Sequence, residues 1–117
     1  MADESSCLFC RIVRGEIPAT VVFRENGVTA FRDIAPQAPT HILVVPDRHI
    51  SGAAAITPAD DALVGMVIRA AAEIARREGI ESRGYRLVVN QGRDAGQSVD
   101  HLHVHLLGGR PLPTPLV

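Results

Sequence analysis

The sequence predicts an α+β domain, with a mostly antiparallel sheet, one long helix and a short N-terminal helix. Short β-branched and aromatic runs follow one another with turn residues between them, which is typical of hairpin-connected strands. One amphipathic segment has the apolar spacing of a long helix. The 117 residues contain no low-complexity linker and no internal repeat. We therefore expect a single domain over 1–117, with its core over about 7–110 and a proline-rich tail over 111–117.

The N-terminal half predicts a short helix followed by three strands. Residues 8–14 (LFCRIVR) are expected to form the short helix. The runs 20–24 and 28–32 surround Asn26-Gly27, and Asn-Gly is a strong signal for a tight hairpin turn. The apolar run 41–46 (HILVVP) is expected to be a buried strand that stops at its proline, while the segment after it has no clear pattern.

The C-terminal half predicts the long helix and two further strands. Thr57 can cap the helix and Pro58 suits its first position, because proline needs no hydrogen bond there. Apolar residues then recur at helical spacing until Gly79, which gives a helix of about 20 residues. The runs 85–90 (YRLVVN) and 102–107 (LHVHLL) are the last two strands, joined by a glycine-bearing loop.

Composition limits the classes of partner. The chain has 46% apolar and 21% charged residues, which is ordinary for a globular domain. A formal charge of -1 argues against nucleic-acid binding driven by a net positive charge. No apolar run approaches the roughly 20 residues of a membrane helix, and the opening MADESSCLFC lacks the basic and apolar regions of a signal peptide. We expect a cytoplasmic protein that binds neither nucleic acid nor membrane.

Three of the five histidines lie on alternate positions of the last predicted strand. Side chains alternate faces along a strand, so His101, His103 and His105 should share one face at a spacing of about 6.6–6.8 Å. Leu102 and Leu106 should then point to the opposite, aliphatic face. One histidine in such a place is ordinarily a packing residue, but three in register each need a polar partner. This pattern favours a functional site over ordinary packing.

The loop before this strand carries groups that suit a phosphate. Gly92 and Gly96 can offer backbone N–H groups, Gln97 an amide and Ser98 a hydroxyl. A glycine-containing hairpin loop alone is more often a plain turn. Its position directly upstream of the histidines favours phosphate binding.

These motifs resemble the histidine triad (HIT) superfamily. The pattern HLHVHLL has the form His-φ-His-φ-His-φ-φ, where φ is apolar, and the similarity extends over 33–50 (DIAPQAPTHILVVPDRHI), 84–92 (GYRLVVNQG) and 96–110 (GQSVDHLHVHLLGGR). It thus covers nearly the whole chain, from about Cys7 to Arg110. The sequence is most similar to the Hint branch, the nucleoside phosphoramidases.

The resemblance implies a HIT-type hydrolase that cleaves purine nucleoside phosphoramidates at the α-phosphate. His103 would be the nucleophile and form a covalent nucleotidyl-histidine, which water then hydrolyses without a catalytic metal. His105 would hydrogen-bond the phosphate oxygens, and Ser98 with Gln97 would touch the phosphate or the leaving group. A dinucleoside polyphosphate hydrolase, or a nucleotide-binding interaction module with incidental hydrolysis, are the alternatives.

The resemblance also implies how a purine nucleotide such as an AMP or GMP derivative is held. Asp33 would bind the ribose hydroxyls, His41 would lie near the α-phosphate, and Asn90 would contact the nucleotide. The apolar residues that match the base pocket are Phe9, Ile12, Ile17, Phe31 and Ile34. Core packing explains Ile12 and Ile17 equally well. The family further implies a homodimer, and the tail after Arg110 departs from better-known Hint enzymes because it has no aromatic residue.

Cys7 and Cys10 form a C-x-x-C motif, which is compatible with a zinc site, a redox pair or two buried thiols. Many bacterial relatives bind zinc through such a pair and two histidines, and the matching residues here are His49 and His101. Two cysteines and two histidines make a closed tetrahedral set, so this zinc would be structural. His101 would then position its strand instead of touching phosphate.

Overall fold

The computed structural model describes residues 4–114 and confirms the α+β class. In chain order its helices and strands are α1 (Leu8–Val13), β1 (Val21–Glu25), β2 (Val28–Arg32), β3 (Thr40–Pro46), α2 (Asp61–Arg77), β4 (Tyr85–Val88) and β5 (Val104–Gly108). Short 3-10 helices cover Glu4–Ser6, Ala53–Ala55, Pro58–Asp60 and Arg93–Ala95. Within the described range, no helix is long and apolar enough to cross a membrane.

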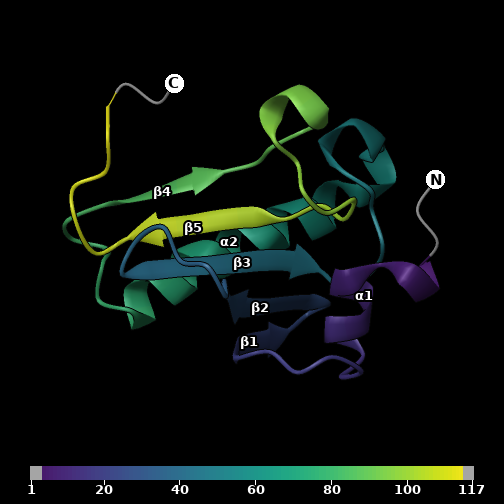
Figure 1. Ribbon diagram of the computed structural model, residues 1–117, viewed down its shortest axis with the longest axis horizontal. Helices are drawn as coiled ribbons and strands as arrows, with labels where there is room; N and C mark the ends of the chain where they lie inside the picture. The colour runs from purple at the N-terminus through teal and green to yellow at the C-terminus, as the bar shows by residue number, and fades with distance from the viewer. Residues whose placement is uncertain (1–3, 115–117) are drawn as a thin grey trace.

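The five strands form one antiparallel sheet in the order β1-β2-β3-β5-β4 (Figure 1). The predicted hairpin is confirmed: Glu25 pairs with Val28, and Asn26 and Gly27 both have positive φ, at 54° and 76°. Such angles at both central residues define the tight turn that matches the twist of the two strands. Because β5 lies between β3 and β4, it is hydrogen-bonded on both sides, which gives its side chains a fixed framework.

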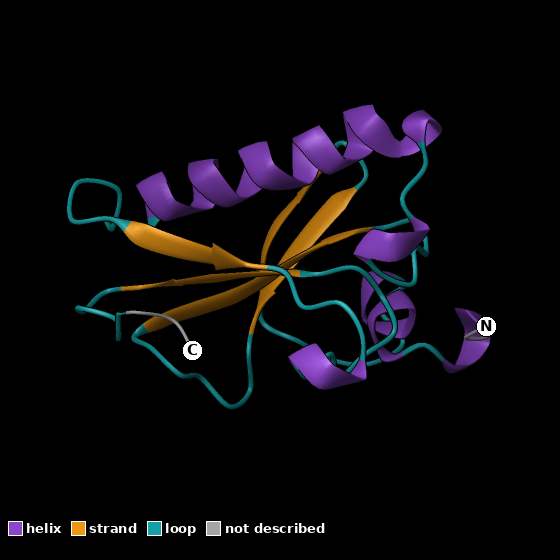
Figure 2. Cartoon of the chain, turned by 90° about the horizontal axis from the view of Figure 1, so that it is seen from above, coloured by secondary structure: helices purple, strands orange, loops and turns teal. Residues whose placement is uncertain are grey.

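Helix α2 covers one face of the sheet (Figure 2). The cap predicted at Thr57 is present as a capping box, in which the Thr57 N–H donates to Asp60 Oδ2 at 2.8 Å. The first turn is a 3-10 helix over Pro58–Asp60, so the α-helix proper starts at Asp61. The core between helix and sheet consists of buried aliphatic residues: Val28, Ala30, Ile42, Val44, Val67, Ala70, Ala71, Ile74, Ala75, Ile80, Val104 and Leu106.

The opposite face of the sheet carries α1 and a second apolar cluster. This cluster consists of Cys7, Phe9, Cys10, Ile12, Phe31, Leu43 and Val45. Helix α1 has only six residues, and an isolated helix of that length is unstable in water. Its stability must come from packing and from its cysteines. His101, His103 and His105 lie on this face.

The predicted elements shift by a few residues in the structure. The last strand begins at Val104 rather than at residue 102, because the preceding backbone bonds leave the ladder: His101 N–H donates to Val99 O and Leu102 N–H to Ile50 O. The strand predicted over 85–90 ends at Val88. The described part of the tail, 111–114, forms no helix or strand, and residues 115–117 of the predicted tail lie outside the described residues.

Candidate active site

The three clustered histidines lie on the face of the sheet that carries α1. The Phe9 ring of α1 contacts both His101 and His103, at centroid distances of 5.9 and 5.1 Å. His103 in turn contacts His105 at 4.9 Å. Val104, between the last two histidines, belongs to the core beneath α2. The predicted alternation is therefore present, although His101 and His103 precede the strand itself.

The hydrogen bond of His103 determines which ring nitrogen is free to react. His103 Nδ1 lies 2.7 Å from the carbonyl oxygen of His101. A carbonyl oxygen can only accept, so in the neutral ring Nδ1 carries the proton and Nε2 keeps its lone pair. The ring is 5% exposed and is enclosed by Phe9 and His105. His103 thus presents an unprotonated nitrogen from a fixed orientation, which is what a nitrogen nucleophile requires.

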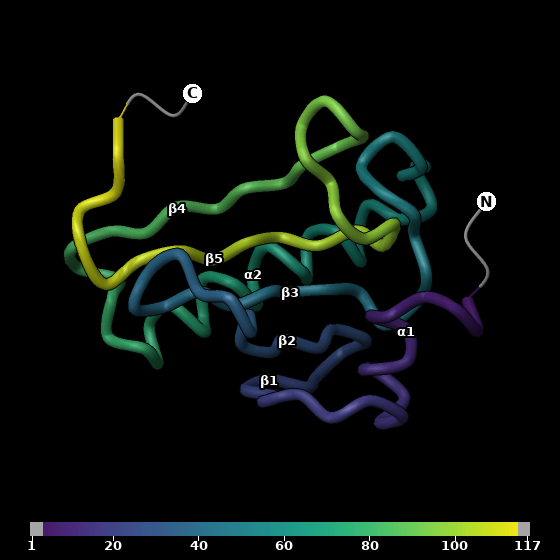
Figure 3. The backbone as a smooth tube through the Cα atoms, in the orientation of Figure 1, coloured from purple at the N-terminus to yellow at the C-terminus, as the bar shows by residue number. Residues whose placement is uncertain are grey.

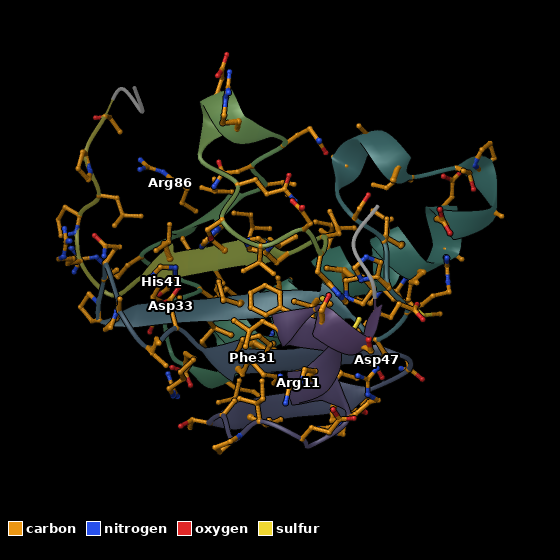
Figure 4. All side chains as sticks on the ribbon, turned by 45° about the vertical axis from the view of Figure 1, so that its right-hand side comes forward. Arg11, Phe31, Asp33, His41, Asp47 and Arg86 are labelled. Carbon is orange, nitrogen blue, oxygen red and sulfur yellow. The ribbon has the colours of Figure 1, made fainter. Side chains whose placement is uncertain are left out.

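A second pair of linked hydrogen bonds orients His105. The Gln37 N–H donates to His41 Nδ1 at 3.0 Å, so a neutral His41 carries its proton on Nε2. His41 Nε2 lies 3.0 Å from His105 Nδ1 and donates to it. His105 is left with its proton on Nε2, as a donor for an anion. Asp33 Oδ2 lies 3.5 Å from His41 Nε2, and Figure 4 shows these two side chains next to each other.

Burial keeps this histidine pair neutral. It lowers the pKa of His41, although the negative charge of Asp33 opposes the shift. Burial, followed by the neighbouring His103 and His41, lowers the pKa of His105 to about 4. An imidazole with this pKa is uncharged at neutral pH, as the donor arrangement above requires.

The depressed pKa of His105 predicts a loss of stability in acid. An unfolded histidine has a pKa of about 6.5, so the unfolded chain binds a proton before the folded one does. The contribution is complete above pH about 6.5 and is lost as the pH falls toward 4. A shift of this size corresponds to about 3 kcal/mol at most. Denaturant unfolding from pH 7 to 4.5 should show His105→Asn losing less stability than the wild type. Parallel profiles for the two proteins would contradict the shift.

The glycine-bearing loop is tied to the loop that follows β3. Gln97 Oε1 accepts from the Gly92 N–H at 2.8 Å, and Gln97 Nε2 donates to Ser51 O and Val99 O at 2.9 and 3.1 Å. The Gln97 amide therefore holds two loops together, and Figure 3 shows them side by side at one end of the sheet. Ser98 follows on the exposed side of this junction.

Close packing at this junction explains one glycine. A Cβ added at Gly52 would lie 2.5 Å from Gln91 Oε1 and 3.2 Å from Gln97 Nε2. The Gln91 amide would have to move, and the Gln97 amide that links the two loops would have to shift by a few tenths of an ångström. Asn90, another candidate, lies half-buried two residues beyond the end of β4.

The apolar candidates divide into packed and exposed residues. Phe9 and Phe31 are 4% and 3% exposed and pack edge to face at 5.3 Å. Ile12 belongs to the same buried cluster, and Ile17 packs against it. Ile34 is fully exposed, next to Asp33. An apolar ligand surface that covers this isoleucine would remove apolar area from water, which would contribute favourable binding free energy.

The four predicted metal ligands lie together at the end of α1. Their ligand atoms lie within 4.8 Å of one another. Cys7 Sγ is 3.4 Å and Cys10 Sγ 3.5 Å from His101 Nδ1, and Cys10 Sγ is 3.3 Å from His49 Nδ1. The Nε2–H of His101 donates to the Pro46 carbonyl oxygen at 2.8 Å. The neutral ring then keeps the lone pair of Nδ1, which points toward the sulfurs.

This donor set fits zinc. Zinc bonds of about 2.3 Å to sulfur and about 2.0–2.1 Å to nitrogen give tetrahedral edges of about 3.5 Å, close to the sulfur–nitrogen separations here. Burial, then the neighbouring Cys7, raises the pKa of Cys10 to about 12, so the thiolate needs a cation beside it. His49 Nε2 is the buried side-chain polar atom that lacks a partner within the described residues. Protein side chains would fill all four coordination positions of the zinc, so such a metal would be structural.

Two main-chain groups that orient the histidines could not be predicted from the residue types in the sequence. The Gln37 N–H and the Pro46 carbonyl belong to the main chain, and their partners lie 4 and 55 residues away. Every residue except proline offers such an N–H, so no side-chain pattern marks it. The side chain of Gln37 is not involved in this contact.

Comparison with known proteins places the chain in a family. A family model described as the HIT domain matches residues 14–112. The chain is 49% identical over 112 residues to a purine nucleoside phosphoramidase of Escherichia coli K12, which covers 96% of this chain and 92% of that protein. A HIT family hydrolase from Legionella pneumophila Philadelphia 1 superposes with a TM-score of 0.92 at 48% identity, over 94% of this chain and 98% of that one. A histidine triad protein from Clostridium difficile gives 0.90 at 41% identity, over 97% of both chains. The chain therefore belongs to the HIT domain family.

Proposed function

We propose that this protein is a hydrolase that cleaves purine nucleoside phosphoramidates, compounds in which an amine is bonded to the α-phosphate. The single observation that carries the proposal is the pairing of a free His103 Nε2 with a donor Nε2–H on the adjacent His105. The identity of 49% to a protein named purine nucleoside phosphoramidase supports this substrate class.

The reaction would take place in two displacements. His103 Nε2 attacks the α-phosphorus, the P–N bond breaks, and the departing amine takes a proton from the solvent. Water then attacks the phosphorus of the nucleotidyl-histidine and returns a proton to the solvent, which releases the nucleoside monophosphate and restores the neutral imidazole. His105 donates to a non-bridging phosphate oxygen as charge develops, and the exposed Ser98 hydroxyl is available to the phosphate or the departing amine.

We propose that the nucleotide is held by residues from several segments of the chain. Asp33 uses Oδ1 to accept from the Ala35 N–H at 2.8 Å, yet each carboxylate oxygen retains a further lone pair for a ribose hydroxyl. We assign the remaining contacts as follows: His41, Asn90 and Gln97 toward the phosphate and sugar, and Phe9, Phe31 and Ile34 toward the base. The exposed Ile34 side chain supports a base stacked over it, since that contact would remove apolar surface from water.

We propose a structural zinc at Cys7, Cys10, His49 and His101, outside the reaction itself. When bound, the metal would crosslink the α1 region to the loop after β3 and to the segment that precedes β5. The substrate would be a derivative of AMP or GMP, and a homodimer in the cytoplasm is the expected form.

A direct substrate comparison tests the proposal. The wild-type protein should hydrolyse an adenosine 5′-phosphoramidate with a kcat/KM at least about tenfold above that for a diadenosine polyphosphate. The guanosine phosphoramidate serves as a matched substrate for base preference. Faster cleavage of the diadenosine compound would replace the proposal by the polyphosphate hydrolase. Tight AMP binding without turnover of either substrate would favour the interaction module.

A further inference from the structure

Phe9 lies between the two cysteines of the proposed metal site and also against the proposed nucleophile. Its ring meets the His103 ring at a centroid distance of 5.1 Å and an interplanar angle of 88°. We propose that Phe9 is a positioning residue for His103, and that the metal centre holds Phe9 in place. This inference rests on the proposed function, because it assigns His103 the attacking nitrogen.

The contacts of His103 show what Phe9 adds. The bond from Nδ1 to the His101 carbonyl fixes one atom of the imidazole but leaves the plane of the ring free to tilt about that bond. His105 restrains the ring from one neighbour, at 4.9 Å and 63°. The near-perpendicular Phe9 ring restrains it from another. Together these contacts fix the direction of Nε2, and a nucleophile that is misdirected by about 1 Å can lose up to about 100-fold in rate.

Two of the three restraints on His103, the Phe9 ring and the His101 carbonyl, come from segments that also supply metal ligands. Phe9 is flanked by Cys7, the N-cap residue of α1, and by Cys10, whose N–H bonds back to Cys7 Sγ at 3.4 Å. The carbonyl that accepts from His103 belongs to His101, a predicted ligand. A metal at this site would thus fix the ring contact and the hydrogen bond at once.

The short length of α1 explains why the position of Phe9 would depend on the metal site. Six helical residues cannot hold their own conformation in water, so the orientation of Phe9 depends on what anchors the helix at its ends. The anchor at the ring itself is Phe31, which packs edge to face against Phe9 at 5.3 Å and 68°. Within the described residues, the ring contact of Phe31 is with Phe9 and not with His103.

The test compares Phe9→Leu with the matched variant Phe31→Leu, which makes the same change one ring further from His103. Steady-state kinetics on the adenosine phosphoramidate should show kcat lowered about tenfold in Phe9→Leu, and by a smaller factor in Phe31→Leu. The nitrogen-15 NMR signals of the His103 ring, recorded without substrate at neutral pH, should show a single Nδ1–H tautomer in the wild type. In Phe9→Leu the Nδ1–H tautomer should remain, because the His101 carbonyl still accepts from it, but the ring signals should shift and broaden as the ring tilts about that bond.

The same NMR signals test the metal link. Removal of zinc from the wild type by a chelator should shift and broaden the His103 ring signals as Phe9→Leu does. Unchanged, sharp His103 signals after metal removal would overturn the link. Wild-type kcat and wild-type His103 signals in Phe9→Leu, with only KM raised, would overturn the positioning role and leave Phe9 as a wall of the base pocket. Absence of turnover in the wild type would instead reject the proposed function, and the NMR comparison would still decide the role of Phe9.

Discussion

Replacement of His103 by alanine is expected to lower turnover of an adenosine phosphoramidate by a factor on the order of 10⁴ or more. The variant keeps the phosphate-binding groups but lacks the Nε2 lone pair on which the covalent route depends. The covalent intermediate should disappear with it. Rapid quenching in alkali, where the P–N bond to histidine is stable, followed by mass spectrometry should find a nucleotide on His103 in the wild type and none in His103→Ala.

The variant His105→Asn is the matched control, because it alters the neighbouring ring while the nucleophile remains. Loss of one donor to a developing charge costs about 10²–10³ in rate, so this variant should be slow but still acquire the nucleotide on His103. Free imidazole should restore part of the activity of His103→Ala, since it can occupy the vacated space. A nucleotide found on His41 or His105 in the wild type would assign the attack to another ring.

The parts of the fold that sequence could predict depend on local chemistry. The Asn26-Gly27 turn favours the positive φ angles that the structure contains, and the chain on either side can only form a hairpin. The Thr57 cap and Gly79 similarly mark the two ends of α2. These signals act within a few residues, so neighbouring sequence is sufficient to read them.

Strand ends were predicted less well because they depend on distant partners. The alternating sequence pattern that places His101 and His103 on one face does not depend on whether these residues pair with a neighbouring strand. They lie outside it because Leu102 bonds to Ile50, a residue of the loop after β3. The apolar pattern of 102–107 does not contain that loop, so it could not show where pairing begins.

The candidate site shows the same division between local and distant causes. Spacing alone predicts three imidazoles on one face, but not their unequal surroundings. His101 meets Cys7 across 94 residues, and His105 meets His41 across 64. Only the resemblance to the HIT family suggested separate roles. The structure adds the reason that each tautomer is fixed, through the carbonyl of Pro46, the carbonyl of His101 and the N–H of Gln37.

Removal of zinc is the second large change that we expect, this time in stability. A ligand that binds only the folded state at a thousandfold excess over its Kd stabilises that state by about 4 kcal/mol. For a domain of this size, such a loss lowers Tm by about 15 °C. The loss should be large here because both cysteines belong to the buried cluster beneath α1. Thermal unfolding of zinc-loaded and chelator-treated protein, with zinc content measured alongside, provides the comparison.

The variant Cys10→Ser separates the metal from the packing of the cysteine. Serine has nearly the shape of cysteine but is a poor zinc ligand, so Cys10→Ser should have a lowered Tm that no longer responds to the chelator. If the thiols stabilise only by packing, the chelator should leave wild-type Tm unchanged while Cys10→Ser is still less stable. The core beneath α2 contains none of the four ligands. The sheet and α2 should therefore remain folded without metal, while α1 loses amide protection in hydrogen exchange first.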